Sequence, residues 1–267
     1  MRLLLIKEIQ TMQLELMKKL HKFLEESNVP YYFLGGSALG AIRHEGFIPW
    51  DDDIDIGIMR EDYEKLLTLI DKFDSSYDVK NFHKSDNCDF VLTRIYFPNS
   101  EISIDSIKDT VLDKRLYMDI FPIDNVPDCD NCLRKFEKKI IRSKRKIALI
   151  DARKYNHSLK TAFKVMLSFL LKPFRHIILK NTDKLMQRYK YEKTKRVCSL
   201  CSQYSFKKQV MPREVYGTPT LHKFCDTEFY LPERIDEYLS TLFGADYMVV
   251  PPPEKRRVGY DIYLLTE

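Results

Sequence analysis

The sequence lacks an uninterrupted apolar run of the ~20 residues that a membrane-spanning helix needs. Its N-terminal apolar run is interrupted by Lys7 and Glu8, too early for the core of a signal peptide. Internal repeats and low-complexity tracts are also missing. We therefore expect a cytoplasmic protein without a membrane anchor. Its 267 residues, 44% of them hydrophobic, suffice for one large domain or for a domain with a sizeable appendage.

Cysteine is scarce and unfavourably placed for a metal centre. The six cysteines include two CxxC pairs, Cys129 with Cys132 and Cys198 with Cys201. Such pairs are typical of structural zinc sites. However, the two pairs lie far apart in the chain and have no flanking histidines. We expect reduced, unligated thiols, and structural zinc is the alternative.

Acidic residues are rare in one long segment. Leu133–Arg196 carries 21 Lys and Arg against 4 acidic residues, which leaves a net charge of −12 for the rest of a chain whose total is +5. Within it, Thr161–Lys180 mixes bulky apolar residues with cations. This pattern fits helices lying on an anionic membrane surface, or a helical hairpin packed on the core, and the two can coexist. Because aromatic residues are not interleaved with the basic ones, we do not expect nucleic-acid binding.

A cluster of acidic residues is the strongest local signal. Asp51, Asp52, Asp53 and Asp55 lie at the start of an expected strand over 53–58. Side chains alternate along a strand, so Asp53 and Asp55 should share one face. Two adjacent carboxylates are costly unless a cation lies between them. The pattern therefore predicts a hard-metal site for Mg²⁺, with Mn²⁺ as a possible substitute.

A glycine turn precedes this cluster. Gly35 and Gly36 follow a short apolar strand over 31–34, and their lack of side chains would let backbone N–H groups approach an anion. We expect Ser37 to cap the helix that follows. A metal site beside a glycine turn at a helix start suits a nucleotide diphosphate.

Asp119 is an isolated acid inside an apolar strand. It could end that strand and pair with Arg94 or Arg115. Alternatively, it could join Asp53 and Asp55 as the third carboxylate of one site. Since an unpaired carboxylate is costly in such a strand, and paired aspartates occur elsewhere, we favour the three-carboxylate site.

Hydrophobic periodicity predicts a mixed α and β protein. We expect a core over 1–130, a basic helical insert over 131–197 and a C-terminal segment over 198–267 that packs back on the core. The expected helices are 4–27, 37–44, 61–73, 132–156, 159–172, 173–190 and 235–243, and the expected strands are 31–34, 53–58, 77–82, 90–97 and 116–121.

Three stretches resemble the LicD family of phosphotransferases, within the nucleotidyltransferase superfamily. They are GGSALGAIRHEGFIPWDDDIDIGI, the strand Met118–Pro122, and the C-terminal Asp236–Arg256. The resemblance implies an α+β fold with a mixed-sheet core of the DNA polymerase β type, flanked by helices. In one departure, this chain has Gly259, Tyr260 and Asp261 where family members often carry histidines, so specificity can differ.

The resemblance also implies an activity. Family members transfer a phospho-alcohol from a CDP-activated donor to a sugar hydroxyl of a cell-surface glycan, such as teichoic acid or lipopolysaccharide. Here the expected reaction is transfer of phosphocholine from CDP-choline, with release of CMP. We expect a bacterial enzyme, peripheral on the inner face of the cell membrane, that acts on a lipid-linked acceptor. The alternatives are transfer of a nucleotide to an acceptor, and a non-enzymatic adaptor.

Each motif residue then has an expected role. Asp53, Asp55 and Asp119 would hold the metal ion, and either Asp119 or Asp51 would be the general base. The donor's phosphates would lie against Gly35, Gly36 and Ser37. Arg43 would bind a phosphate oxygen or form a surface salt bridge with Glu45 or Glu61. Trp50 would pack over the strand or stack on the donor, and His44 would be structural.

Overall fold

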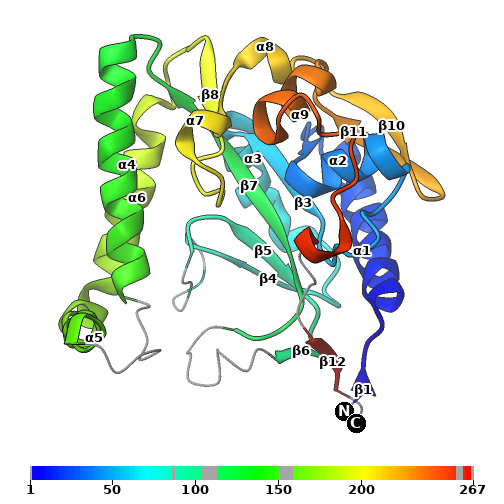
Figure 1. Cartoon of the computed structure of the whole chain (residues 1–267), viewed down its shortest axis with the longest axis horizontal. Helices are drawn as coiled ribbons and strands as arrows, with labels where there is room; N and C mark the ends of the chain where they lie inside the picture. The colour runs from blue at the N-terminus through cyan, green and yellow to red at the C-terminus, as the bar shows by residue number, and fades with distance from the viewer. Residues whose placement is uncertain are drawn as a thin grey trace.

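A mixed five-strand path forms the centre of the fold (Figure 1). The computed structural model describes residues 2–83, 85, 88, 90–103, 113–150, 159–256 and 261–265. The strands follow the order β2 (Tyr32–Phe33), β3 (Asp55–Met59), β7 (Tyr117–Val126), β5 (Thr93–Tyr96) and β4 (Asp78–Asn81). β3 and β7 are parallel, whereas the other neighbours are antiparallel. The predicted α+β class with a mixed sheet is confirmed.

Three helices of the N-terminal half pack around this sheet. They are α1 (Ile6–Glu26), α2 (Gly35–His44) and α3 (Arg60–Leu69), and the short η1 (Ile70–Lys72) follows α3. α1 buries a stripe that includes Ile9, Leu16 and Leu20, at the spacing of one helix face. The amphipathic helix predicted over 4–27 is therefore confirmed.

β7 is longer than the predicted strand over 116–121. Beyond Ile120 it leaves β5 behind and pairs instead with β8 (Arg196–Cys198), which pairs in turn with β9 (Val210–Pro212). Pro122 misled the prediction because proline cannot donate a backbone hydrogen bond. Pairing with β5 stops at Ile120, so the missing N–H breaks no bond of that ladder.

The basic segment forms a helical layer beside the sheet. α4 (Asp130–Ile150) and α6 (Arg175–Met186) lie side by side, and α5 (Leu159–Leu171) lies across their end (Figure 1). The predicted helix over 132–156 extends outside the described residues after 150. The helix predicted over 173–190 is divided into η3 (Lys172–Phe174), α6 and η4 (Gln187–Tyr189).

α4 and α6 are anchored on the core. A second hydrophobic cluster joins them to β7 and β8, through Val126, Phe136, Ile140, Met186, Cys198 and Leu200. The Asn125 amide also donates to the carbonyl oxygens of Tyr189 and Glu192, at 3.1 and 2.7 Å. Of the Thr161–Lys180 stretch, the α6 part is therefore packed on the core, through Leu179, as the hairpin hypothesis expects; α4 lies outside that stretch. The exact domain boundaries stay a prediction.

The C-terminal segment returns to the core. Its elements are α7 (Phe206–Gln209), α8 (Arg213–Tyr216), β10 (Thr220–Phe224), β11 (Thr227–Leu231), α9 (Ile235–Phe243) and η5 (Pro253–Lys255). Phe224 and Phe229 of the β10–β11 hairpin pack on Phe33 of β2. A small separate sheet joins β12 (Asp261–Leu264) to β1 (Arg2–Leu3) and β6 (Ser100–Ser103). Within the described part of the chain, every helix is too short or too polar to span a bilayer.

Candidate active site

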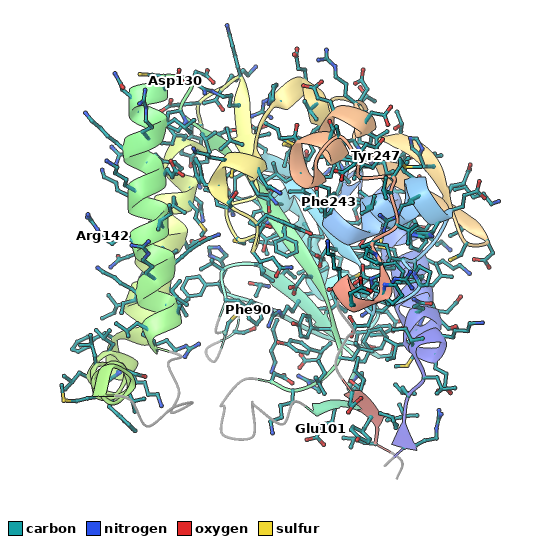
Figure 2. All side chains as sticks on the ribbon, viewed as in Figure 1. Phe90, Glu101, Asp130, Arg142, Phe243 and Tyr247 are labelled. Carbon is teal, nitrogen blue, oxygen red and sulfur yellow. The ribbon has the colours of Figure 1, made fainter. Side chains whose placement is uncertain are left out.

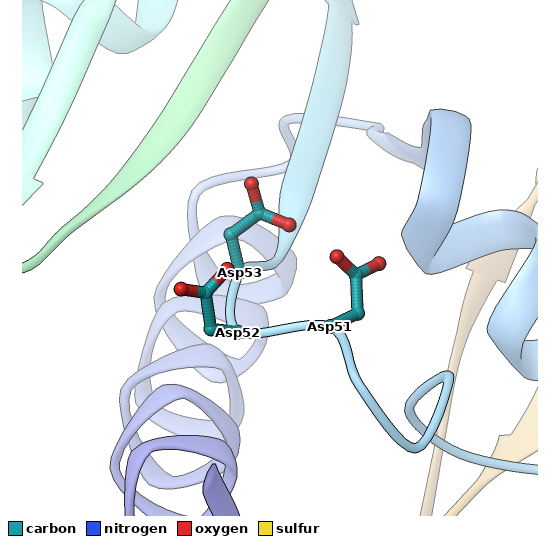
Figure 3. A group of neighbouring side chains, drawn as sticks. All are labelled: Asp51, Asp52 and Asp53. Atoms are coloured by element: carbon teal, nitrogen blue, oxygen red, sulfur yellow. The ribbon is translucent and has the colours of Figure 1, made fainter. Parts of the chain in front are cut away.

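The parallel pairing of β3 and β7 brings the predicted carboxylates to one edge of the sheet. Asp55, the first residue of β3, lies opposite Asp119 of β7 in the register. The loop before β3 adds Asp51, Asp52 and Asp53, which can each offer an oxygen within 4.8 Å of the others (Figure 3). Figure 3 shows the carboxylates of Asp51 and Asp53 directed to the same side. The predicted strand over 53–58 starts only at Asp55, so Asp53 lies in the loop.

These carboxylates strongly perturb one another. Loss of hydration raises the pKa of Asp51 to about 6 and that of Asp53 to about 8, with repulsion from the neighbouring acids adding to both. Asp53 is exposed to solvent, but protein atoms surround it closely enough to weaken its hydration. Burial, Asp53 and Asp119 raise the pKa of Asp55 well above its usual range. A divalent cation would relieve this repulsion, so the donor set fits a hard metal ion.

Asp119 pairs with Arg94, as one hypothesis expected, and it also lies beside Asp55, as the three-carboxylate hypothesis expected. Its carboxylate accepts hydrogen bonds from Arg94, at 2.7 Å from Nε and 3.4 Å from Nη2. The Arg94 guanidinium lies 4.4 Å from the ring centre of Phe90 and 4.1 Å from that of Tyr117. At the same time, Asp119 raises the pKa of Asp53 and Asp55, so it is their close neighbour. Arg94 therefore positions Asp119 and supplies a cation at the edge of the cluster.

The glycine turn fits closely against the acidic loop. A Cβ atom on Gly36 would lie 2.5 Å from Asp51 Oδ2, so only glycine lets that carboxylate approach the start of α2. Gly35 has a φ of +50°, and its N–H donates to the Tyr238 hydroxyl at 3.0 Å. The prediction that Ser37 caps α2 is wrong, because the helix begins at Gly35 after Leu34. The Ser37 hydroxyl instead accepts a hydrogen bond from the Asp55 N–H at 2.8 Å.

Substituting Gly36 by alanine tests this fit. We expect catalytic activity to fall by about tenfold or more, because the Asp51 carboxylate must move. Thermal stability should not fall, since a side-chain end can shift and alanine favours a helix by up to about 1 kcal/mol. Gly40→Ala in the same helix is the matched control: its Cβ would lie 2.5 Å from the Gly46 carbonyl oxygen, so it should lower the melting temperature. Equal activity in Gly36→Ala and wild type would contradict this role.

Arg43, His44 and Trp50 hold the C-terminal segment in place. The Arg43 Nη1 donates to the Tyr247 carbonyl oxygen at 2.9 Å, and its Nε donates to His44 at 3.0 Å. Glu45 pairs with Lys223 instead of Arg43. Trp50 contacts His44 edge-on and lies 4.5 Å from the Arg256 guanidinium. The structural role expected for His44 agrees with these contacts, whereas phosphate binding by Arg43 stays a prediction.

A pocket of about 380 Å³ opens beside the acidic loop. Gly36, Trp50 and Asp51 line it from the core, and Tyr204 and Lys255 line it from the C-terminal segment. Sequence reasoning missed the last two residues. Lys255 lies in the Asp236–Arg256 stretch that resembled the family, and that resemblance was the available signal. Tyr204 carried none.

Two glutamines of α1 hold the acidic loop and were also missed. The Gln10 side chain donates to the Asp51 carbonyl oxygen at 2.9 Å. The Gln13 side chain donates to the Asp52 carbonyl oxygen at 3.4 Å and to the Tyr117 carbonyl oxygen of β7 at 3.0 Å. Gln13 is fully buried within the apolar stripe of α1. A polar residue in such a stripe is itself a signal, because buried polar groups need partners.

The cysteines stay separate from this site. All six are free thiols; Cys129 and Cys132 are exposed, whereas Cys198 is buried in β8. Among the described residues, the group suited to holding a metal ion is Asp51, Asp52 and Asp53 and contains no cysteine.

Comparison with known proteins identifies the class. Residues 28–148 match the family described as LicD/FKTN/FKRP, nucleotidyltransferase domain. This span contains the glycine turn, all the carboxylates described above and Arg94. Residues 28–148 therefore carry a LicD-family domain, and the homology supports a phosphotransferase of the LicD type.

Two relatives place the chain more closely. It is 26% identical over 263 residues to the lipopolysaccharide cholinephosphotransferase LicD of Haemophilus influenzae, with 96% of each chain covered. It is also 56% identical over 39 residues to the human ribitol 5-phosphate transferase FKRP, which covers 15% of this chain and 8% of FKRP. The first similarity extends through the basic insert and the C-terminal segment, and the second is confined to a short stretch.

Proposed function

We propose that this protein transfers a phospho-alcohol, with phosphocholine from CDP-choline as the first candidate, to a sugar hydroxyl of a cell-surface glycan precursor and releases CMP. The carboxylate cluster beside the glycine turn and the 380 Å³ pocket is the observation that carries this proposal. The cholinephosphotransferase relative, matched along 96% of its length, supports the choice of alcohol. We further infer that the mixed sheet is of the nucleotidyltransferase type.

Mg²⁺ or Mn²⁺ bound at Asp53, which belongs to the Asp51–Asp53 group and is next to Asp55 and Asp119, would neutralise charge on the donor's phosphates. Gly36 lets the Asp51 carboxylate lie against the start of α2, and Lys255 adds a cation to the pocket wall. Asp51 is the better of the two candidate general bases, because both carboxylate oxygens of Asp119 contact Arg94. Asp51 would accept the proton of the attacking sugar hydroxyl.

A glycan precursor on a lipid carrier is the acceptor that we propose. This assigns the enzyme a peripheral place on the cytoplasmic face of the cell membrane. Teichoic acid and lipopolysaccharide precursors both present suitable sugar hydroxyls. In this proposal the acidic cluster binds the donor's phosphates through the metal ion, and the sugar of the acceptor determines which glycan is modified.

Donor turnover tests the proposal. The purified enzyme is incubated with Mg²⁺, CDP-choline and a glycolipid extract of bacterial membranes, and CMP is measured. We expect CMP release that depends on the extract and is abolished by a chelator. CDP-ethanolamine, CDP-glycerol and CDP-ribitol in parallel reactions identify the preferred alcohol. Pyrophosphate release from CTP, with no CMP from any CDP-alcohol, would instead identify a nucleotidyltransferase.

A further inference from the structure

An apolar surface remains uncovered at the end of the basic helical layer. Its residues occupy α5, η3 and the start of α6, and we call this surface the α5 tip: Met166, Phe169, Leu170, Phe174 and Ile177. Phe169 is 66% exposed and Leu170 is 61% exposed. Met166, Phe169 and Leu170 share one face of α5, at the i, i+3 and i+4 spacing, and Phe174 and Ile177 follow in η3 and α6. Exposed apolar patches of this kind mark interaction sites.

The opposite face of these helices already makes the packing contacts. Ser168 is buried, and its hydroxyl donates to the Ile150 carbonyl oxygen at the end of α4 at 2.6 Å. Leu179 of α6 is buried in a cluster with Phe82 and Cys88. The α5 tip is therefore what remains outside after the helices are anchored. Its apolar residues are available to a partner.

The sequence that forms the α5 tip carries charge of one sign. From 159 to 182 the sequence contains no Asp or Glu. Lys172 is exposed and lies 4.9 Å from the ring centre of Phe169, and Lys180 is exposed on α6. An apolar stripe flanked only by cations matches a surface of acyl chains beneath anionic headgroups. A second copy of the chain fits less well, because it would bring cations against cations.

The position of the α5 tip connects it to the active site. α4 has 21 residues, roughly 30 Å, and runs back alongside β7 from Asp130 (Figure 2). α5 consequently lies at the end of the molecule where β7 begins, the end that carries Asp119 (Figure 1). A pocket of about 370 Å³ lies between α4 and α6 on one side and β5 on the other, lined by Phe90, Arg94, Ile147 and Leu179, among others. It extends from the helical layer to Arg94, which holds Asp119.

We propose that the α5 tip docks on an anionic lipid surface and presents this end of the enzyme to the bilayer. The apolar stripe enters the boundary between headgroups and acyl chains, and Lys172 and Lys180 contact the headgroups. Its purpose rests on the proposed function, since a lipid-linked acceptor would then reach the carboxylates by way of the 370 Å³ pocket. The docking itself does not depend on which group the enzyme transfers.

Vesicle binding tests the docking. The full chain is sedimented with vesicles of phosphatidylglycerol and phosphatidylcholine, or of phosphatidylcholine alone, at two salt concentrations. We expect binding to the anionic vesicles that weakens with salt. The double variant Phe169→Ser/Phe174→Ser should bind about tenfold or more weakly. Lys172→Glu/Lys180→Glu should lose a similar factor. These side chains are exposed, so the folded state should persist.

Matched variants distinguish binding through the α5 tip from nonspecific adsorption of exposed apolar or basic side chains to vesicles. Leu221→Ser on β10 removes an apolar side chain that is 49% exposed, and Lys207→Glu/Lys208→Glu changes two exposed cations on α7; both should bind vesicles like the wild type. Wild-type binding by Phe169→Ser/Phe174→Ser would overturn the proposal, as would a wild type that ignores anionic vesicles. The proposal would also be overturned if the wild type were a dimer, the variant a monomer, and vesicle binding the same in both. CDP-choline with Mg²⁺ should raise the melting temperature of the wild type and this variant equally. If the melting temperature of neither protein rises, the proposed function fails, whereas the docking proposal is still decided by the sedimentation result.

Discussion

Asp53→Asn is expected to lower the rate of CMP release from CDP-choline by about a thousandfold. Asp53 lies in the acidic loop next to the edge formed by Asp55 and Asp119; Asp119 raises the pKa of Asp53, and both raise the pKa of Asp55. Removing one carboxylate removes several kcal/mol of metal-assisted stabilisation of the transition state, which corresponds to about that factor in rate. The measurement is CMP release at saturating donor, with and without Mg²⁺.

Stability distinguishes this loss from misfolding. Because Asn carries no charge, Asp53→Asn relieves repulsion among the acids, so without metal the variant should melt at the same temperature as the wild type or higher. Mg²⁺ should raise the melting temperature of the wild type and have less effect on the variant. Glu228→Gln is the matched control, since it removes one exposed negative charge on β11, away from the cluster. Full activity in Asp53→Asn would show that the carboxylates are not the catalytic centre.

The sequence was sufficient to predict that Asp55 and Asp119 lie at one edge of the sheet, although the strand argument was incomplete. Alternation along one strand would have placed Asp53 and Asp55 on a single face. In the structure Asp53 lies in the loop, and it is the parallel pairing of β3 with β7 that sets Asp55 opposite Asp119. The family resemblance pointed to this outcome; local periodicity cannot, because it contains no information about which strands pair.

The supporting residues could not be predicted for a related reason. Gln13 and Tyr117 are 104 positions apart, and the contact between them exists only once α1 has packed across the loop. Tyr204 and Lys255 reach the pocket because the C-terminal segment folds back over Trp50. Arg94 was recognised as a partner for Asp119, but its place between two aromatic rings was not. Such contacts depend on tertiary packing rather than on local sequence.

Asp124→Asn is expected to cost about 3–5 kcal/mol of unfolding free energy. Arg60 Nε lies 2.6 Å from Asp124 Oδ1, and the two side chains are 3% and 1% exposed. They join the start of α3 to the far end of β7, beyond the pairing with β5. Replacing the carboxylate leaves the Arg60 charge buried without a counter-charge. Urea unfolding followed by circular dichroism measures the difference.

The double variant Arg60→Met/Asp124→Leu should recover much of that loss. Burial raises the pKa of Asp124 even though Arg60 opposes the change, so dehydration of this carboxylate outweighs its attraction to the arginine. Apolar side chains of similar size avoid that cost. The half-buried pair between Lys190 and Glu64 is the control: Glu64→Gln should cost less than about 1 kcal/mol, because water reaches both side chains. If the double variant were as unstable as Asp124→Asn, the pair would itself stabilise the junction of α3 and β7, and dehydration would not be the dominant effect.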